Sequence, residues 1–263
     1  MTNLADQVIA ALRSGHDDLA AYAERLDETA LAGPSGASEW DVSHVLSHLG
    51  SGAEIGLATL EAALAGGGSP GAEFNHRVWD RWNAMRAVEH RDGFRTANRR
   101  LVERYEGLDE ATRAELRIDL GFLPAPVSVA EAARLRLSEF TYHTWDVKVG
   151  ADAAATLAPL AVPLLLDGIV PLIGFMGRAE TLGGRRAILA VELTDPQRSY
   201  GLDLGDAVAI TERPERPDGV LRAPAEAWLR LVAGRLAPKW TPPGLEITGP
   251  MSLDDLRRAF PGY

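Results

Sequence analysis

The chain has 263 residues, a formal net charge of −10 and a pI near 5.1. Non-specific binding to nucleic acid or to an anionic membrane surface requires a basic excess, so this acidic balance disfavours both partners. Because the sequence contains no cysteine, it excludes disulfides, cysteine-based zinc fingers and a cysteine nucleophile.

The N-terminal part of the sequence predicts two helices. Apolar residues recur at helical spacing over residues 3–31, and glycine and proline break the pattern at 33–36. The next helix follows this loop, with Asp41 or Ser38 as its N-cap, and runs to about Ala65. The acidic, amphipathic start lacks the features of a secretory signal, so we expect a cytoplasmic protein.

Two further helical regions follow a glycine-rich stop at 66–71. The first spans about Phe74 to Glu106, with a kink or interruption expected near Gly93. The second begins after Ser128, a candidate N-cap, and continues through Leu137 to Val149. Four helical segments joined by short or medium loops favour an up-and-down bundle.

The most apolar stretch of the chain spans residues 157–176. Three prolines and Asp167 interrupt it, which favours a buried helix over a membrane span. We expect a helix from Leu157 to Arg178 that extends or covers the bundle.

The periodicity changes near Thr181 to Arg185, where we place a domain boundary. Short strands are predicted beyond it, at residues 187–193, 200–204, 207–211, 220–222 and 245–248. Pro224 is suited to the first position of a helix, and Ser252 with Asp255 resembles a capping box before a short terminal helix. The fold class is therefore mainly α with α+β: a helical bundle over 1–180 and a small α+β domain over 185–263.

One stretch of the fourth helix carries residues suited to metal binding. Glu139 and His143 are four residues apart, so their side chains leave the same face of the helix. This spacing alone is weak evidence, because acid–histidine pairs arise by chance on many solvated helices. The second helix offers His44 and His48 in a similar setting.

The six histidines differ in their sequence neighbourhoods. His48 is in phase with apolar residues of its helix, which leaves a core role and a ligand role both open, whereas His44 lies nearer the serine side. His16 and His90 stand among charged residues and are predicted to be on the surface. His76 is expected to cap a helix, lie on the surface or edge a pocket.

A set of two histidines and one carboxylate suits Zn²⁺ and leaves one coordination position open for water or substrate. Nitrogen and carboxylate ligands also suit Fe²⁺, Mn²⁺ or Ni²⁺. An open position allows Lewis-acid chemistry, whereas a structural zinc site normally has all four positions filled by protein.

Two stretches together carry a family resemblance. The sequence from Trp40 to His48, followed by Leu49-Gly50, and the sequence Glu139-Phe-Thr-Tyr-His143-Thr-Trp-Asp-Val resemble the mycothiol-dependent maleylpyruvate isomerase family of the DinB-like superfamily. The stretch GVLRAPAEAWLRLVAGR is similar to that family's sterol-carrier-like C-terminal domain. The resemblance covers nearly the whole chain.

This resemblance implies a DinB-like four-helix bundle that holds a divalent metal, most often zinc, through His48, Glu139 and His143. His44 falls where the family pattern has no ligand. The open metal position is implied to take the thiol of mycothiol, and the thiolate to add to a small electrophile. For maleylpyruvate, rotation about the resulting single bond and elimination would give the fumaryl isomer. The implied partners are this thiol and a small electrophilic substrate, with the protein a monomer or homodimer.

The substrate determinants depart from the family pattern. The characterised isomerase uses a C-terminal-domain arginine, and Arg222 and Arg235 are the nearest candidates here, but the local motif singles out neither. A mycothiol S-transferase of unassigned substrate is therefore an alternative. Two non-catalytic alternatives are a protein that holds an apolar ligand in its C-terminal domain and a regulatory bundle with a vestigial metal site.

Overall fold

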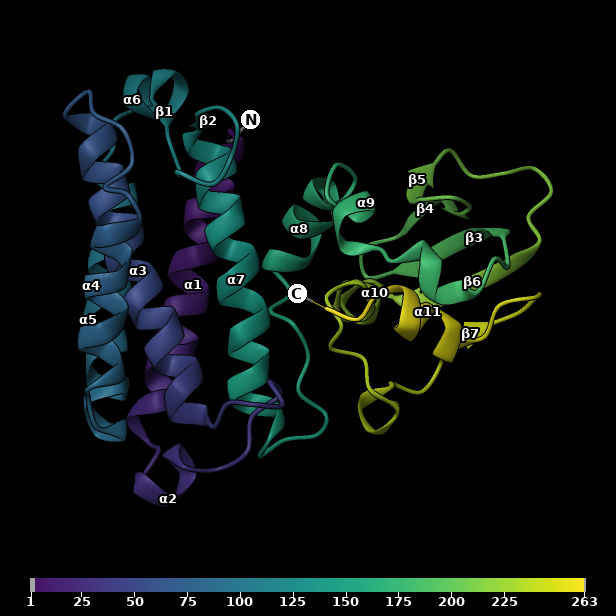
Figure 1. Ribbon diagram of the computed structural model, residues 1–263, viewed down its shortest axis with the longest axis horizontal. Coiled ribbons are helices and arrows are strands. Elements are labelled where there is room, and N and C mark those ends of the chain that lie inside the picture. The colour runs from purple at the N-terminus through teal and green to yellow at the C-terminus, as the bar shows by residue number, and fades with distance from the viewer. Residues whose placement is uncertain (1–2, 263) are drawn as a thin grey trace. The chain divides into compact units, whose positions relative to one another are not determined.

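The computed structural model describes residues 3–262, which divide into two compact units (Figure 1). The first unit ends at Asp152 and the second begins at Ala153. This division precedes the predicted boundary near Thr181 to Arg185. The intervening segment belongs to the second unit because its short helices pack on the strands and helices that follow it.

The first unit is helical, and a four-helix bundle forms its core (Figure 1). Its helices are α1 (Leu4–Glu24), α2 (Glu28–Leu31), α3 (Val42–Leu64), α4 (Ala72–Asn83), α5 (Ala87–Glu106), α6 (Glu110–Glu115) and α7 (Val129–Val149). Helices α1 and α3 each pack on both α5 and α7, so the four long helices close a ring. The predicted bundle is confirmed.

Capping residues determine where the two site-bearing helices begin. Asp41, and not Ser38, caps α3 by accepting a hydrogen bond from the His44 amide at 2.8 Å. Ser128 caps α7 as predicted and forms a reciprocal capping box with Glu131. Each cap satisfies backbone N–H groups that the helix leaves free, and so fixes the turn from which later side chains project.

Two details of the first unit were predicted wrongly. The helical region 74–106 breaks at residues 84–86 instead of near Gly93, which lies inside α5. A Cβ at Gly93 would lie 2.9 Å from the Trp82 ring, so this glycine provides room for packing. In addition, β1 (Arg117–Ile118) and β2 (Val127–Ser128) form a two-residue antiparallel ladder in a connection where no strand was expected.

The prediction that His16 and His90 are surface residues is also wrong, because both are buried. His90 Nδ1 lies 2.8 Å from Ser43 Oγ, and its Nε2 lies 2.8 Å from the Trp82 carbonyl oxygen. His16 Nδ1 lies 3.1 Å from Asn98 Nδ2. Their charged sequence neighbours occupy other faces of the same helices, so charge nearby in sequence did not indicate exposure.

The second unit is α+β, as predicted (Figure 1). It contains α8 (Ala161–Ile169), α9 (Ile173–Met176), the 3₁₀ helices η1 (Ala179–Leu182) and η2 (Pro238–Trp240), α10 (Ala225–Val232), α11 (Leu253–Ala259), and strands β3 (Ala187–Thr194), β4 (Arg198–Leu204), β5 (Val208–Thr211), β6 (Gly219–Pro224) and β7 (Glu246–Ile247). The strand order is β5-β4-β3-β6-β7, and only the β3–β6 pair is parallel. No helix in the described range is long and apolar enough to cross a membrane.

The apolar segment predicted as one helix from Leu157 to Arg178 forms α8 and α9, which are separated around Pro171. Proline removes a backbone donor and crowds the preceding turn, which accounts for the break. Helix α8 packs on α10, and α9 packs on β5. The segment expected to extend or cover the bundle therefore belongs to the second unit.

Replacing Asp255 with alanine should destabilise the second unit by about 1–3 kcal/mol, the cost of losing a helix cap and buried hydrogen bonds. Asp255 is buried, accepts a hydrogen bond from the Ser252 amide at 2.8 Å and contacts Arg185 and Arg258. Urea unfolding followed by circular dichroism would measure the loss. The matched control is Asp254→Ala, which removes an exposed carboxylate and should change stability by less than about 0.5 kcal/mol.

The stabilisation that Asp255 gives to the second unit should depend on pH. The hydrogen bond from Arg185 and those from Ser252 hold the pKa of Asp255 well below its usual value, although burial opposes this. A carboxyl whose pKa is lowered by folding stabilises the fold above its ordinary pKa of about 4, and this contribution is lost as the pH falls further. The difference in unfolding free energy between the native protein and Asp255→Ala should therefore become smaller below about pH 4. A constant difference between pH 7 and pH 3 would contradict this assignment.

Candidate metal centre

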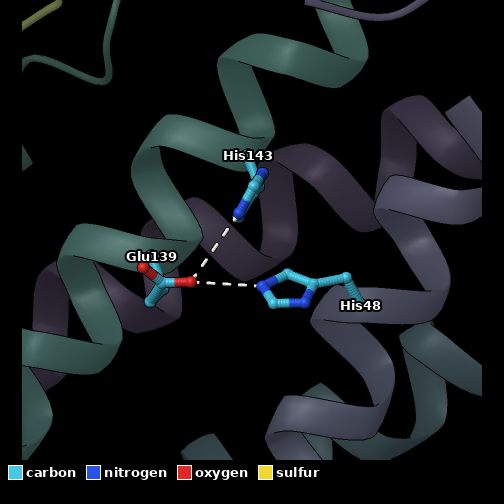
Figure 2. Close-up of side chains that lie close together, drawn as sticks. All are labelled: His48, Glu139 and His143. Carbon is cyan, nitrogen blue, oxygen red and sulfur yellow. Dashed lines mark hydrogen bonds and ion pairs between the residues drawn. The ribbon is translucent and has the colours of Figure 1, made fainter. Parts of the chain in front are cut away.

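Three side chains from two helices converge inside the first unit (Figure 2). His48 projects from α3, whereas Glu139 and His143 project from one face of α7. Glu139 Oε2 lies 3.1 Å from His48 Nε2 and 3.7 Å from His143 Nε2. One ligand atom from each residue lies within 4.8 Å of the other two. Within residues 3–262, no other set of three histidine or acidic side chains converges in this way.

The spacing of these atoms fits a small divalent cation. Donors bound tetrahedrally at zinc bond lengths of about 2.0–2.2 Å stand roughly 3.3–3.6 Å apart. The observed separations of 3.1 and 3.7 Å lie on either side of that range. Only small side-chain adjustments are therefore needed for the two nitrogens and the carboxylate oxygen to bind one ion.

The three side chains are exposed to different extents. The His143 side chain is only 10% exposed, whereas those of His48 and Glu139 are 36% and 38% exposed. Helix α7 is buried on all sides from Phe140 to Val147. The candidate metal site is therefore accessible to solvent at His48 and Glu139 and buried at His143.

A buried carboxylate orients His143. His143 Nδ1 lies 2.8 Å from Asp146 Oδ2, and the Asp146 side chain is fully buried. When Nδ1–H donates to this carboxylate, Nε2 carries the lone pair and faces Glu139. Asp146 was not predicted as a site residue from the sequence, although its position three residues after His143 on the same helix was a usable signal.

The loop before α3 packs against the same part of α7. The Gly36 amide donates to the Asp146 carbonyl oxygen at 2.8 Å, and a Cβ at Gly36 would lie 2.6 Å from Asp146 Oδ1. The end of the loop brings the Trp40 ring to 5.1 Å from the His48 ring and 6.0 Å from the His143 ring, measured between centroids. Trp40 is partly exposed, so an indole forms one edge of the group.

The charge on Glu139 is stabilised by its neighbours. Burial opposes ionisation, but the hydrogen bond from His48 and the charges of His143, His48 and Arg136 together lower the pKa of Glu139 to about 2. Its carboxylate is therefore ionised at neutral pH and can act as an anionic ligand.

The remaining candidates lie outside this group. His44 is largely exposed, and its Nδ1 lies 2.8 Å from the capping carboxylate of Asp41. His76 is exposed on α4 with its ring edge-on to Trp79.

The two arginine candidates lie in the second unit. Arg222 is paired with Glu192 at 3.0 Å, and Arg235 donates to the Ala233 carbonyl oxygen at 3.0 Å. The structure thus brings together His48, Glu139 and His143 and leaves His44 apart.

Comparisons with known proteins give a consistent result. The family described as the mycothiol maleylpyruvate isomerase N-terminal domain matches residues 12–148, a range that contains all three converging residues. The fold is similar to the crystal structure of a mycothiol-dependent maleylpyruvate isomerase, with a TM-score of 0.65, 15% identity, and 96% of this chain and 98% of that chain covered. The crystal structure of a histidine-to-alanine mutant of the isomerase matches with a TM-score of 0.65 and 14% identity, and again 96% of this chain and 98% of that chain are covered. No protein of curated function matches the chain in sequence.

Proposed function

Because this chain belongs to the family of the mycothiol maleylpyruvate isomerase N-terminal domain, we propose that it is a divalent-metal-dependent enzyme of the maleylpyruvate isomerase type that uses mycothiol. The observation that carries this proposal is the convergence of His48, Glu139 and His143, whose ligand atoms lie within 4.8 Å of one another. Two of these residues come from a helix distant in sequence from the third, so the fold itself brings the set together.

His48, Glu139 and His143 would hold the metal, and zinc is the ion that suits this donor set best. A divalent metal at this place would supply Lewis-acid activation and would favour the thiolate form of a thiol. Asp146 accepts from His143 Nδ1 and keeps Nε2 available as a ligand. The ionised carboxylate of Glu139 supplies negative charge, and the partial exposure of His48 and Glu139 leaves a side from which a small molecule can approach.

The thiol must come from outside the protein, because the chain contains no cysteine. An isomerase and an S-transferase both begin with attack of this thiol on a small electrophile. They differ in the next step: the isomerase eliminates the thiol, whereas the transferase releases the adduct. We propose the isomerase reaction and keep mycothiol S-transfer as the alternative, since the residues of the metal group serve the first step of both.

Metal analysis followed by thiol titration tests this proposal. Protein purified without chelator should contain about one divalent ion per chain. After replacement of the native ion by Co²⁺, mycothiol should produce an intense sulfur-to-cobalt absorption band, and maleylpyruvate should then be converted to its isomer. A protein that takes up no divalent metal, or a cobalt form whose spectrum does not respond to the thiol, would overturn the proposal. A stable thiol adduct in place of the isomer would favour the transferase.

A further inference from the structure

Arg136 lies on α7, three residues before Glu139, and its guanidinium is bound by neutral groups. Its Nη2 donates to the Leu49 carbonyl oxygen at 2.7 Å and to Asn98 Oδ1 at 2.9 Å. Leu49 directly follows His48 on α3. The arginine thus connects the two helical turns that carry the converging ligands.

The surroundings hold this guanidinium in place. Asn98 is fully buried on α5, and its amide nitrogen lies 3.1 Å from His16 Nδ1 on α1. The Phe140 ring centroid lies 5.9 Å from the Arg136 Cζ. A Cβ at Gly52 would lie 3.0 Å from Nη1, so a small residue at that position makes room for the cation. Helices α3, α5 and α7 therefore surround the guanidinium, and α1 contacts Asn98 through His16.

Among residues 3–262, this cation has no directly paired anion. Within the described residues, no carboxylate forms an ion pair with Arg136, and its buried Nε has no hydrogen-bond partner. Burial lowers the pKa of Arg136 to about 10, with Glu139 and Tyr105 acting in the opposite direction, so the group remains charged at neutral pH. Burying a charge costs free energy unless an opposite charge compensates it. Glu139, whose negative charge opposes the effect of burial on the pKa of Arg136, is also a member of the metal group.

The charges near the metal position can be counted. A divalent ion with the carboxylates of Glu139 and Asp146 sums to zero, and Arg136 raises the sum to +1. We propose that Arg136 gives the loaded site this net positive charge and so makes its open position select a monoanion, such as a thiolate, over a neutral ligand. This inference rests on the proposed function, because it requires a divalent ion bound by His48, Glu139 and His143.

The test compares an anionic and a neutral ligand of the same cobalt-loaded protein. At pH 8, azide is a monoanion and imidazole is mainly neutral, and both change the visible spectrum of bound Co²⁺ when they occupy the open position. Arg136→Gln should weaken azide binding about tenfold, the scale of one charge removed at short range in a partly buried site. Imidazole binding should change by less than about twofold. Arg136→Lys retains the charge and should retain most of the azide affinity.

Asn98→Asp provides a second variant should Arg136→Gln fail to fold. It keeps the side-chain shape and places a carboxylate next to Arg136, where Asn98 Oδ1 now lies 2.9 Å from Nη2. Azide binding should again weaken while imidazole binding is retained. An equal loss of both ligands would reduce Arg136 to a positioning residue, and unchanged azide binding would remove its role. Either result overturns this inference alone, whereas a native protein that takes up no metal overturns the proposed function as well.

Discussion

Replacing His143 with alanine is expected to remove the metal from the protein. The change deletes one of three ligands and leaves Glu139 facing His48 alone across the site. Loss of an outer-sphere partner typically weakens metal binding 10–100-fold, so loss of a direct ligand should weaken it by more than about 100-fold. Helical content should persist, because the apolar contacts among the four long helices supply most of the folding free energy.

Chelator competition measures the affinity, and circular dichroism measures the helical content. The control is His76→Ala, which removes an exposed histidine on α4 and should leave metal binding unchanged. A His143→Ala variant that keeps the native affinity would show that this residue is not a ligand. Loss of helical content together with the metal would show that the histidine supports the fold.

Replacing Asp146 with alanine should have the second-largest effect on the metal. Without the carboxylate 2.8 Å from Nδ1, the His143 ring loses the partner that fixes its tautomer and orientation. The expected result is metal affinity 10–100-fold weaker than in the native protein. Because the aspartate is fully buried, the variant should also unfold at lower denaturant concentration.

The control for this variant is Asp17→Ala, which removes an exposed carboxylate from α1 in the same bundle. It should change neither metal affinity nor stability measurably. If Asp146→Ala lowers stability but binds metal as tightly as the native protein, Asp146 serves the packing of α7 against the loop at Gly36 and does not tune the site.

The parts of the site that depend on one helix could be predicted from sequence. Glu139 and His143 share a face because four residues complete about one turn, and Asp41 and Ser128 carry recognisable capping chemistry. The partnership of His48 with that pair spans 91 residues of sequence. Periodicity left the role of His48 open, and the family resemblance supplied the expectation.

Features that depend on packing between segments distant in sequence could not be predicted from the sequence. Burial of His16 and His90 depends on polar partners from other helices, Asn98 and Ser43, that lie far away in sequence. The burial of Asp146 likewise depends on a distant segment, the loop at Gly36, whose amide donates to the Asp146 carbonyl oxygen. The domain boundary was placed late because the apolar stretch over residues 157–176 has helical character but packs with the second unit.

Metal stoichiometry in the native protein, His48→Ala and His44→Ala decides whether His48, and not the neighbouring His44, is a ligand of the metal. The two histidines are one helical turn apart, but only His48 lies beside Glu139. The Nδ1 of His44 instead lies 2.8 Å from the carboxylate of Asp41, the N-cap of the same helix. Purified without chelator and analysed by mass spectrometry, the native protein and His44→Ala should each carry about one divalent ion per chain, and His48→Ala should carry almost none. Metal lost from His44→Ala and retained by His48→Ala would contradict the assignment of the site.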